Sequence, residues 1–98
     1  MSNRLLSVAA SIAILASVGV LSTAQAADER FCEEYAKAAV NQFHGAERHE
    51  RCDGFRRRDQ ARWQPDFRAH YDWCRSVRRE QALDERDART RALDECAR

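Results

Sequence analysis

Four cysteines at nearly even spacing constrain this chain more than any other feature of its sequence. Cys32, Cys52, Cys74 and Cys96 are separated by 20, 22 and 22 residues. An even number of cysteines in a short exported chain is typical of a disulfide framework. A structural zinc site usually needs two close pairs, such as C-x2-C. The spacing therefore favours two disulfides, and we expect no bound metal.

The N-terminal segment has the pattern of an export signal. Arg4 gives it a positive start, the following stretch up to Leu21 carries no charge, and Ala24-Gln25-Ala26 forms a small-x-small cleavage site. We predict cleavage after Ala26, which makes residues 1–26 a signal peptide and residues 27–98 one periplasmic or secreted domain. An uncleaved membrane anchor is the alternative, but the apolar stretch is slightly shorter than the roughly 20 residues of a span. We therefore expect no transmembrane span in the mature form.

Apolar residues recur at helical rather than strand spacing after the signal segment. Alternating β-branched runs are missing from residues 27–98, whereas steps of three and four residues are frequent. A first helix is expected over residues 28–43, with Asp28 as its N-cap and Gly45 ending it. Its apolar face comprises Phe31, Tyr35, Ala36, Ala39, Val40 and Phe43.

Two further helices are expected in the C-terminal half. One starts at Pro65, because proline is a favoured first helical residue, and runs to about Ser76. The other spans residues 79–97, where a thin apolar stripe is surrounded by opposite charges at helical spacing. We favour a bend between the two, and one long continuous helix is the alternative.

The polar connection over residues 46–64 is too long to be left free in a small domain. Cys52 is expected to pin it, and a short helical turn is compatible with residues 55–62. Together these elements predict an all-α domain of three helices, similar to a helical hairpin and held by disulfides.

Four cysteines allow three pairing schemes. If the three helices run down, up and down, Cys32 and Cys74 meet at one end, and Cys52 and Cys96 meet at the other. We therefore predict the pairs Cys32–Cys74 and Cys52–Cys96. Neighbour pairing, Cys32–Cys52 with Cys74–Cys96, is the main rival. In a continuous helix Cys74 and Cys96 would lie about 33 Å apart and could not bond.

The sequence after the signal segment contains no recognisable catalytic constellation. Disulfide pairing would leave no free thiol for a Cys–His pair, Ser76 is the only serine in this part, and the three glycines of the whole chain are scattered. The histidines His44, His49 and His70 are expected to serve hydrogen bonding or ring packing rather than catalysis. We therefore predict that the protein is not an enzyme and needs no cofactor.

The best binding signal is the basic stretch of residues 48–79, which holds ten arginines and five carboxylates. Arginine interleaved with aromatic side chains can bind anionic polymers, membrane headgroups or nucleic acid. We do not expect nucleic acid, because an exported protein rarely meets it. A solvated face is the plainer interpretation, and the spacing of Trp63, Phe67, Tyr71 and Trp73 equally suits a core. The candidate binding residues are Arg56, Arg57, Arg58, Arg62, Trp63 and Trp73.

Several short motifs stand out along the predicted mature domain. They are Cys32-x-x-Tyr35-Ala36-x-x-Ala39-Val40-x-Gln42, Cys52, Arg62-Trp63, His70-Tyr71-x-Trp73-Cys74 and Leu93-x-x-Cys96. This pattern resembles a group of small exported bacterial proteins of unknown function, and the resemblance covers nearly the whole domain. It implies a secreted, disulfide-bonded, mostly helical module and transfers no activity. The group often has a glycine-rich stretch after the second cysteine, where this chain has Asp53-Gly54-Phe55-Arg56-Arg57-Arg58.

These observations favour an exported, non-catalytic module that acts by binding a protein or polymer of the cell envelope. One alternative is a binder of anionic polymer or membrane headgroups through the Arg-rich face of residues 48–79. Another is a periplasmic acid-stress chaperone. Protonation of the 16 carboxylates and three histidines of the predicted mature domain would leave a large positive charge that strains a small fold.

Overall fold

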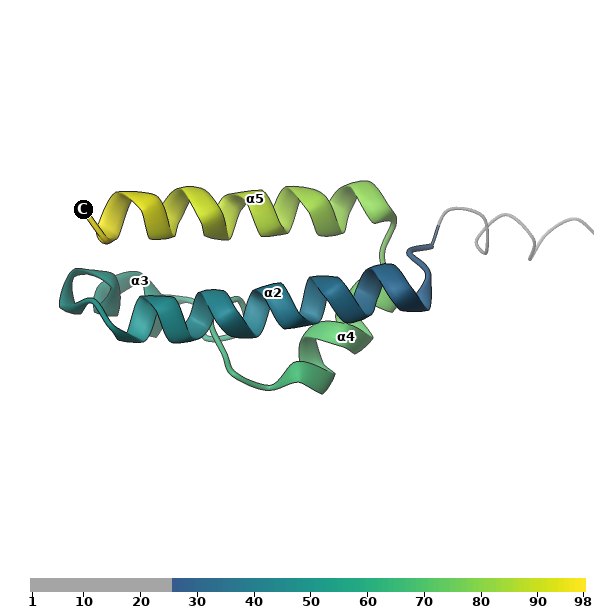
Figure 1. The fold of residues 1–98 in the computed structure, drawn as a ribbon, viewed down its shortest axis with the longest axis horizontal. Helices are drawn as coiled ribbons and strands as arrows, with labels where there is room; N and C mark the ends of the chain where they lie inside the picture. The colour runs from purple at the N-terminus through teal and green to yellow at the C-terminus, as the bar shows by residue number, and fades with distance from the viewer. Residues whose placement is uncertain (1–25) are drawn as a thin grey trace, which may run out of the picture.

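The computed structural model describes residues 26–98, which form four α-helices and one short 3-10 helix (Figure 1). The elements are α2 (Glu29–Glu47), the 3-10 helix η1 (Glu50–Cys52), α3 (Asp53–Arg58), α4 (Phe67–Arg75) and α5 (Arg79–Cys96). The described part is therefore all-α, as the periodicity predicts, but it has one helix more than expected. The predicted signal peptide, apart from Ala26, lies outside the described residues.

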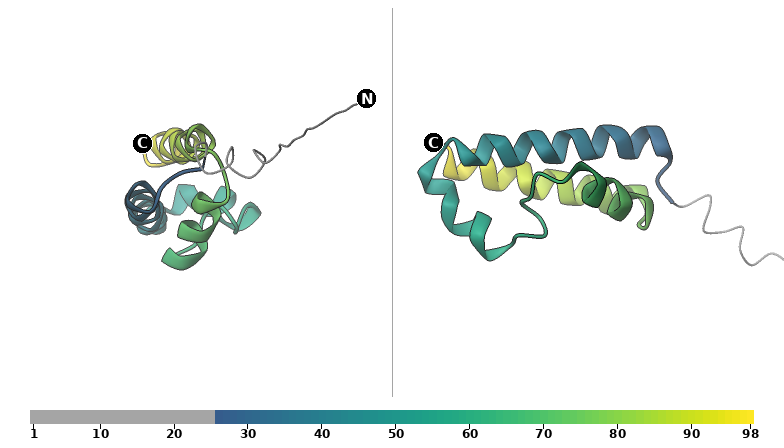
Figure 2. Two further views of the ribbon diagram at one scale, coloured as in Figure 1. Left: turned by 90° about the vertical axis from the view of Figure 1, so that its right-hand side faces the viewer. Right: turned by 90° about the horizontal axis from the view of Figure 1, so that it is seen from below.

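The three longer helices run down, up and down along one axis. α2 and α5 lie side by side and run in the same direction, while α4 returns against α2 (Figure 1 and Figure 2). η1 and α3 form a compact turn at the C-terminal end of α2, beside the end of α5. α2 is central because it packs against both α4 and α5. Within residues 26–98, no helix combines the length and the apolar character needed to cross a membrane.

α2 begins where the sequence predicts and ends later. The Asp28 side chain caps it by accepting a hydrogen bond from the Phe31 backbone N–H at 2.8 Å. The prediction that Gly45 ends the helix is wrong, since α2 continues to Glu47 and Gly45 is buried in its last turns. A Cβ placed on Gly45 would lie 3.4 Å from Leu93 Cδ2. The space between α2 and α5 at this point therefore accepts a methyl group in ordinary contact and nothing much larger.

The connection after α2 is more helical than expected. Helical structure covers residues 50–58, whereas the sequence suggested only a short turn over 55–62. Trp63 folds back onto this segment, is 3% exposed and packs against Phe55 with ring centroids 4.6 Å apart. The polar connection is thus an integral part of the folded domain.

Pro65 does not start α4, contrary to the expectation. The Asp66 carboxylate is the N-cap and accepts hydrogen bonds from the backbone N–H groups of Arg68 and Ala69 at 3.0 and 3.3 Å. A side chain that caps from this position fixes the first helical residue as Phe67. Proline therefore lies just before the cap instead of inside the first turn.

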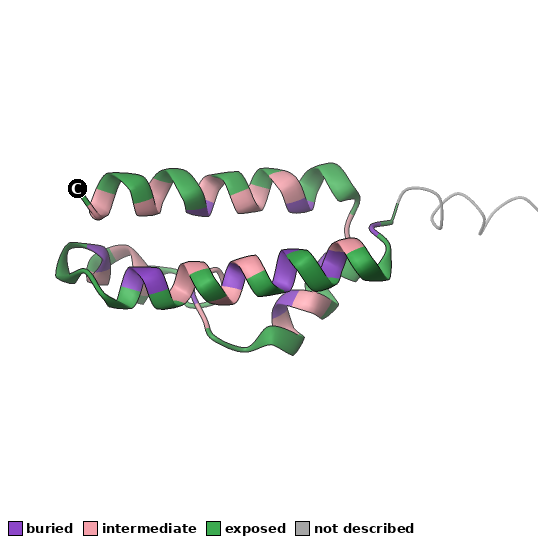
Figure 3. Ribbon diagram, viewed as in Figure 1, coloured by how far each residue is buried: buried purple, intermediate pink, exposed green. Residues whose placement is uncertain are grey.

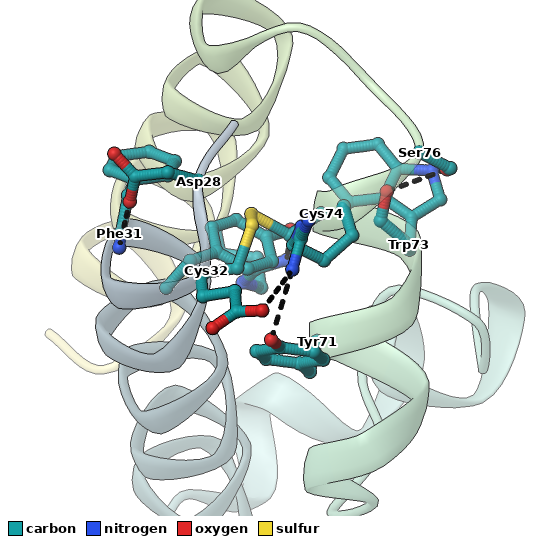
Figure 4. The surroundings of a disulfide bond; sticks show 11 residues. Asp28, Phe31, Cys32, Tyr71, Trp73, Cys74 and Ser76 are labelled. Atoms are coloured by element: carbon teal, nitrogen blue, oxygen red, sulfur yellow. Dashed lines mark hydrogen bonds and ion pairs between the residues drawn. A yellow bond between two sulfur atoms is a disulfide. The ribbon is translucent and has the colours of Figure 1, made fainter. Parts of the chain in front are cut away.

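The bend between α4 and α5 is fixed from two sides, and it excludes the continuous-helix alternative. The Ser76 hydroxyl donates to the Trp73 carbonyl oxygen at 2.7 Å just past the end of α4 (Figure 4). The segment before α2 holds the next residue, because the Ala27 N–H donates to the Val77 carbonyl oxygen at 3.3 Å. α5 then starts anew at Arg79.

Two disulfides join Cys32 to Cys74 and Cys52 to Cys96. This confirms the predicted pairing and excludes pairing between sequence neighbours. The first disulfide links the beginning of α2 to the end of α4 (Figure 4), and the second links η1 to the end of α5. The two bonds indicate an oxidising environment outside the cytoplasm.

The apolar core is divided into two small clusters, one around each disulfide. We call them the first and the second disulfide cluster. The buried members of the first are Ala27, Cys32, Tyr35, Cys74 and Ala82. The second consists of buried Ala46, Cys52 and Trp63, with Phe43, Phe55, Ala92, Leu93 and Cys96 packed against them. Buried positions recur along α2, whereas α5 has few (Figure 3).

The close approach at Gly45 gives a stability prediction. Gly45→Ala should raise the free energy of unfolding by about 0.5–1 kcal/mol, because alanine favours the helix and its methyl group only reaches ordinary contact with Leu93. Urea unfolding of the oxidised protein measures this change.

The bulkier variant Gly45→Val is the matched test of the spacing. Its branched side chain would have to displace Leu93, so it should lower the unfolding midpoint. A loss of stability in the alanine variant would contradict this spacing of α2 and α5.

Candidate functional site

Arg89 lies in the middle of α5 and is only 1% exposed. Its Nε donates a hydrogen bond to Gln42 Oε1 at 2.8 Å, and its Nη1 donates to the Tyr35 hydroxyl at 3.2 Å. The guanidinium carbon also lies 5.0 Å from the centre of the Tyr35 ring. Hydrogen bonds to a charged group contribute about 1.5–3 kcal/mol each. A buried arginine therefore joins α5 to α2 between the two disulfide clusters.

Glu85 is shared by two arginines. Its carboxylate accepts from Arg62 Nε at 2.6 Å and from Arg62 Nη2 at 3.1 Å, and it lies 3.6 Å from Arg89 Nη1. The hydrogen bond with Glu85 raises the pKa of Arg62. This ion pair ties the segment before α4 to the face of α5 that carries Arg89. We refer to Arg62, Glu85, Arg89, Gln42 and Tyr35 as the polar layer.

A pocket of about 330 Å³ opens beside the polar layer. We call it the central pocket. Its walls come from α2, α4, α5 and the segment that leads into α4. Its volume is near the lower end of the range of about 300–1,000 Å³ that is usual for small-molecule sites. The lining residues are Tyr35, Asp59, Ala61, Arg62, Gln64, Ala69, His70, Trp73, Glu85 and Arg89.

Trp73 gives the central pocket an accessible aromatic wall. Its ring packs on Tyr35 with centroids 5.6 Å apart and planes tilted by 32°, yet the residue remains 39% exposed. Phe67 is equally exposed on the same helix, where it stacks on Tyr71 outside the pocket. α4 thus presents one exposed aromatic residue to the pocket and a second one away from it.

His70 is buried at the edge of the pocket. Its Nε2 lies 2.9 Å from the carbonyl oxygen of Gln64, and its ring meets the Tyr35 ring edge-on. Burial lowers the pKa of His70, the bond to Gln64 partly offsets this, and the positive charge of Arg89 lowers it further. The imidazole is therefore neutral near pH 7, with Nε2–H donating to Gln64.

The polar groups beside the aromatic wall of the pocket are buried and mostly engaged with one another. Burial raises the pKa of Tyr35, so its hydroxyl keeps its proton at neutral pH. Arg89 Nη2 is buried without a hydrogen-bond partner among residues 26–98. His70 is engaged with the backbone and holds no nucleophile in hydrogen-bond contact. In the same residues, no three metal-ligating side chains come together.

The structure separates the binding residues predicted from the sequence. Arg62 and Trp73 line the central pocket. Arg56 and Arg57 instead lie beside a second hollow near the second disulfide cluster and both pair with Asp53. Arg58 is exposed at the end of α3.

Trp63 belongs mainly to the packed core. It touches the second hollow but is almost fully buried against Phe55. The four aromatic residues that lie close together in the sequence therefore have different structural roles. Trp63 is core, Phe67 and Tyr71 stack on the outer side of α4, and Trp73 faces the central pocket.

The sequence analysis named Arg62 as a candidate site residue but missed the rest of the polar layer, Arg89 above all. A signal was present in the stripe of α5, where Ala82, Arg89 and Cys96 are separated by seven residues each. Residues at this spacing lie on one face of a helix. An arginine between a buried alanine and a disulfide cysteine is therefore directed toward the core.

No family model matches this chain, and comparison with curated proteins and with solved structures likewise gives no match.

The environment of His70 predicts how stability changes with pH. Because its folded pKa is lowered from 6.5, the unfolded chain binds a proton that the folded one does not when the pH falls below about 6.5. The free energy of unfolding should therefore fall on acidification through this range, by at most about 1.4 kcal/mol per pH unit. Arg89, Asp66 and Glu85 are the charged groups that act on His70.

Urea unfolding between pH 7.5 and 5.5 measures this dependence. His70→Gln keeps a donor for the Gln64 carbonyl group but does not titrate, so it should flatten the profile. The exposed His49 provides the control, and His49→Gln should behave as the unchanged protein. Equal slopes for the His70 and His49 variants would contradict the assignment.

Proposed function

We propose that this protein is an exported, non-catalytic module that acts by binding a component of the cell envelope through the central pocket. The observation that carries the proposal is the pocket itself. It lies between two disulfide-fixed ends and combines an exposed tryptophan with a polar layer whose positions are set by buried hydrogen bonds. Such a site is held ready before the ligand arrives, which lowers the entropic cost of binding.

Export to the periplasm or the medium is part of the proposal. The disulfides support it, since they persist in oxidising compartments. The N-terminal sequence supports it as well, with a cleavage site after Ala26. The resemblance to small exported bacterial proteins points in the same direction.

Binding is favoured over catalysis by the way the pocket residues are engaged. His70 has its Nε2 committed to a backbone carbonyl group, and Glu85 is held by two arginines. A general base must be free to accept a proton from the reacting group. These contacts instead hold side chains in fixed positions, which is what a binding site needs.

Binding of anionic polymer or membrane headgroups through residues 48–79 is a weaker candidate. Carboxylates accompany many of the arginines in this face. Arg56 and Arg57 share Asp53, Arg62 pairs with Glu85, and Arg68 pairs with Asp72. Such pairs reduce the positive electrostatic potential that would attract a polyanion to this face.

An acid-stress chaperone is the second candidate function, and the polar layer favours it. Acid would protonate His70, which is buried beside Arg89 between the two disulfide clusters. The middle of the domain would open while the ends remain linked, and the buried side chains of Tyr35 and Ala39 would become exposed. Full helicity and no dye-accessible apolar surface at pH 2 would exclude this candidate.

The binding proposal predicts a specific role for Trp73. In co-sedimentation with isolated cell-envelope fragments, Trp73→Ala should lower the bound fraction about tenfold, because the pocket loses its aromatic wall. Phe67→Ala is the matched control, since Phe67 is equally exposed on the same helix but lies outside the pocket. The control should bind like the unchanged protein.

Circular dichroism should first show that both variants keep the helical fold. Equal binding by the Trp73 and Phe67 variants would exclude the central pocket as the site. A steep loss of binding with added salt, unaffected by Trp73→Ala, would instead favour the Arg-rich face.

A further inference from the structure

The two disulfides differ in how deeply their cysteines are buried. Cys32, Cys52 and Cys74 are 0% exposed, whereas Cys96 is partly exposed. Cys96 is also the last residue of α5, and the last turn of a helix opens more readily than its interior. The Cys52–Cys96 disulfide therefore has one cysteine in a position that a second molecule can approach.

The chain around Cys96 is held partly by contacts at the surface. The Ala97 N–H closes the last turn of α5 by donating to the Leu93 carbonyl oxygen at 2.9 Å. Arg51 Nη1 donates to the Arg98 carbonyl oxygen at 2.6 Å, and both of these arginines are exposed. Water competes for exposed hydrogen bonds, so each of them adds little to stability. The last turn of α5 can therefore open without a change in the rest of the domain.

The surroundings of Cys74 are different, although this cysteine also lies near the end of a helix. The Ala27 N–H donates to the Val77 carbonyl oxygen at 3.3 Å, which fixes the chain just after α4. Ala27, Tyr35 and Ala82 are buried with this disulfide in the first disulfide cluster. Exposure of the first disulfide would require α2, α4 and the segment before α2 to separate, which costs much of the stability of the domain.

Opening of the Cys52–Cys96 disulfide would loosen one end of the domain and leave the rest linked. The first disulfide would still join α2 to α4, and Arg89 would still join α5 to α2. At the loosened end, Trp63 is 3% exposed and belongs to the second disulfide cluster together with Cys52. Reduction would therefore make Trp63 accessible to solvent while the middle of the domain keeps its arrangement.

We propose that Cys52–Cys96 is a site of thiol–disulfide exchange with an exported dithiol oxidoreductase, while Cys32–Cys74 stays closed and holds the fold. A thiolate of the dithiol attacks Cys96 Sγ, the bond to Cys52 breaks, and Cys52 leaves as a thiolate that takes up a proton.

The second thiol of the oxidoreductase completes the exchange. It attacks the mixed disulfide, so the oxidoreductase leaves with its own disulfide and Cys96 is released as a thiol. In total, two electrons and two protons pass from the dithiol to this protein. The inference goes beyond the proposed binding function and does not depend on it, because Cys52 and Cys96 lie outside the lining of the central pocket.

Graded reduction of the oxidised protein tests the proposed site. The protein is treated with limiting dithiothreitol, new thiols are blocked with iodoacetamide, and mass spectrometry locates the labelled cysteines. Cys52 and Cys96 should be labelled about tenfold faster than Cys32 and Cys74, because exchange requires access to a sulfur atom. Equal rates for the two disulfides, or faster opening of Cys32–Cys74, would overturn the inference.

A pair of substitutions tests whether the last turn of α5 controls this access. Ala97→Pro removes the N–H that closes the turn, so it should speed opening of the second disulfide about threefold or more. Ser76→Ala is the matched control, since it removes a hydrogen bond at the end of α4 but leaves the contact between Ala27 and Val77. It should change neither rate. An unchanged rate in Ala97→Pro would contradict the proposed route of access.

A thioredoxin whose second active-site cysteine is replaced by serine tests the class of partner. This variant can attack a disulfide but cannot complete the exchange, so it should remain joined to the protein as a mixed disulfide. Peptide mapping should place the link at Cys96. Failure to trap a mixed disulfide, or a link to any other cysteine, would overturn the assignment of the partner.

The two tryptophans report whether the opening is local. In NMR spectra recorded after selective reduction, the indole N–H signal of Trp63 should shift, because Trp63 is buried in the second disulfide cluster. The signal of Trp73, which lines the central pocket, should keep its position. Equal changes in both signals would show that the whole domain opens, and would contradict the proposal.

Discussion

Two disulfides hold the ends of a domain whose middle is polar, and the rest of the structure depends on this arrangement. They join residues 42 and 44 positions apart. In the chain-entropy model, loops of this length contribute about 4 kcal/mol each to stability. The net stability of a domain is only about 5–15 kcal/mol. Two covalent links of this size allow each apolar cluster to remain small.

The polar layer is possible because the two disulfides remove the need for a large, continuous apolar core. A continuous apolar core would leave no place for a buried arginine, because removing a guanidinium from water is costly. Here the clusters lie at the two ends, and Arg89 occupies the gap with Gln42, Tyr35 and Glu85 as partners. The same gap leaves space for the central pocket. Stability and the proposed binding therefore rely on the same few side chains.

Most of the architecture is predictable from the sequence, because covalent geometry and periodicity act over long stretches. The cysteine spacing, combined with a down-up-down order of helices, gave the correct pairing. The exact ends of the helices are less predictable from the sequence. Gly45 looks like a helix end, but α2 continues to Glu47, with Gly45 buried beside Leu93 of α5. The Asp66 cap overrides the preference of Pro65 for the first helical position.

The candidate site was predictable only in part. Arg62 and Trp73 could be selected as candidates by residue type alone. The sequence of α5 offers several arginines, and only packing decides which one is buried. The spacing of seven residues that relates Arg89 to Ala82 and Cys96 indicates burial of Arg89 only once Cys96 is known to pack against the second disulfide cluster. Sequence periodicity alone is therefore a poor predictor of the burial of a charged residue such as Arg89.

The burial of Arg89 can be measured directly by hydrogen exchange of arginine side chains in the 15N-labelled, oxidised protein. Its Nε–H proton donates to Gln42 in a buried site. One Nε–H signal with nuclear Overhauser contacts to the Tyr35 ring should therefore exchange with water far more slowly than that of exposed Arg57. Exchange of the Arg89 proton as fast as that of Arg57 would contradict the polar layer, and with it the account of how the middle of this domain is held together.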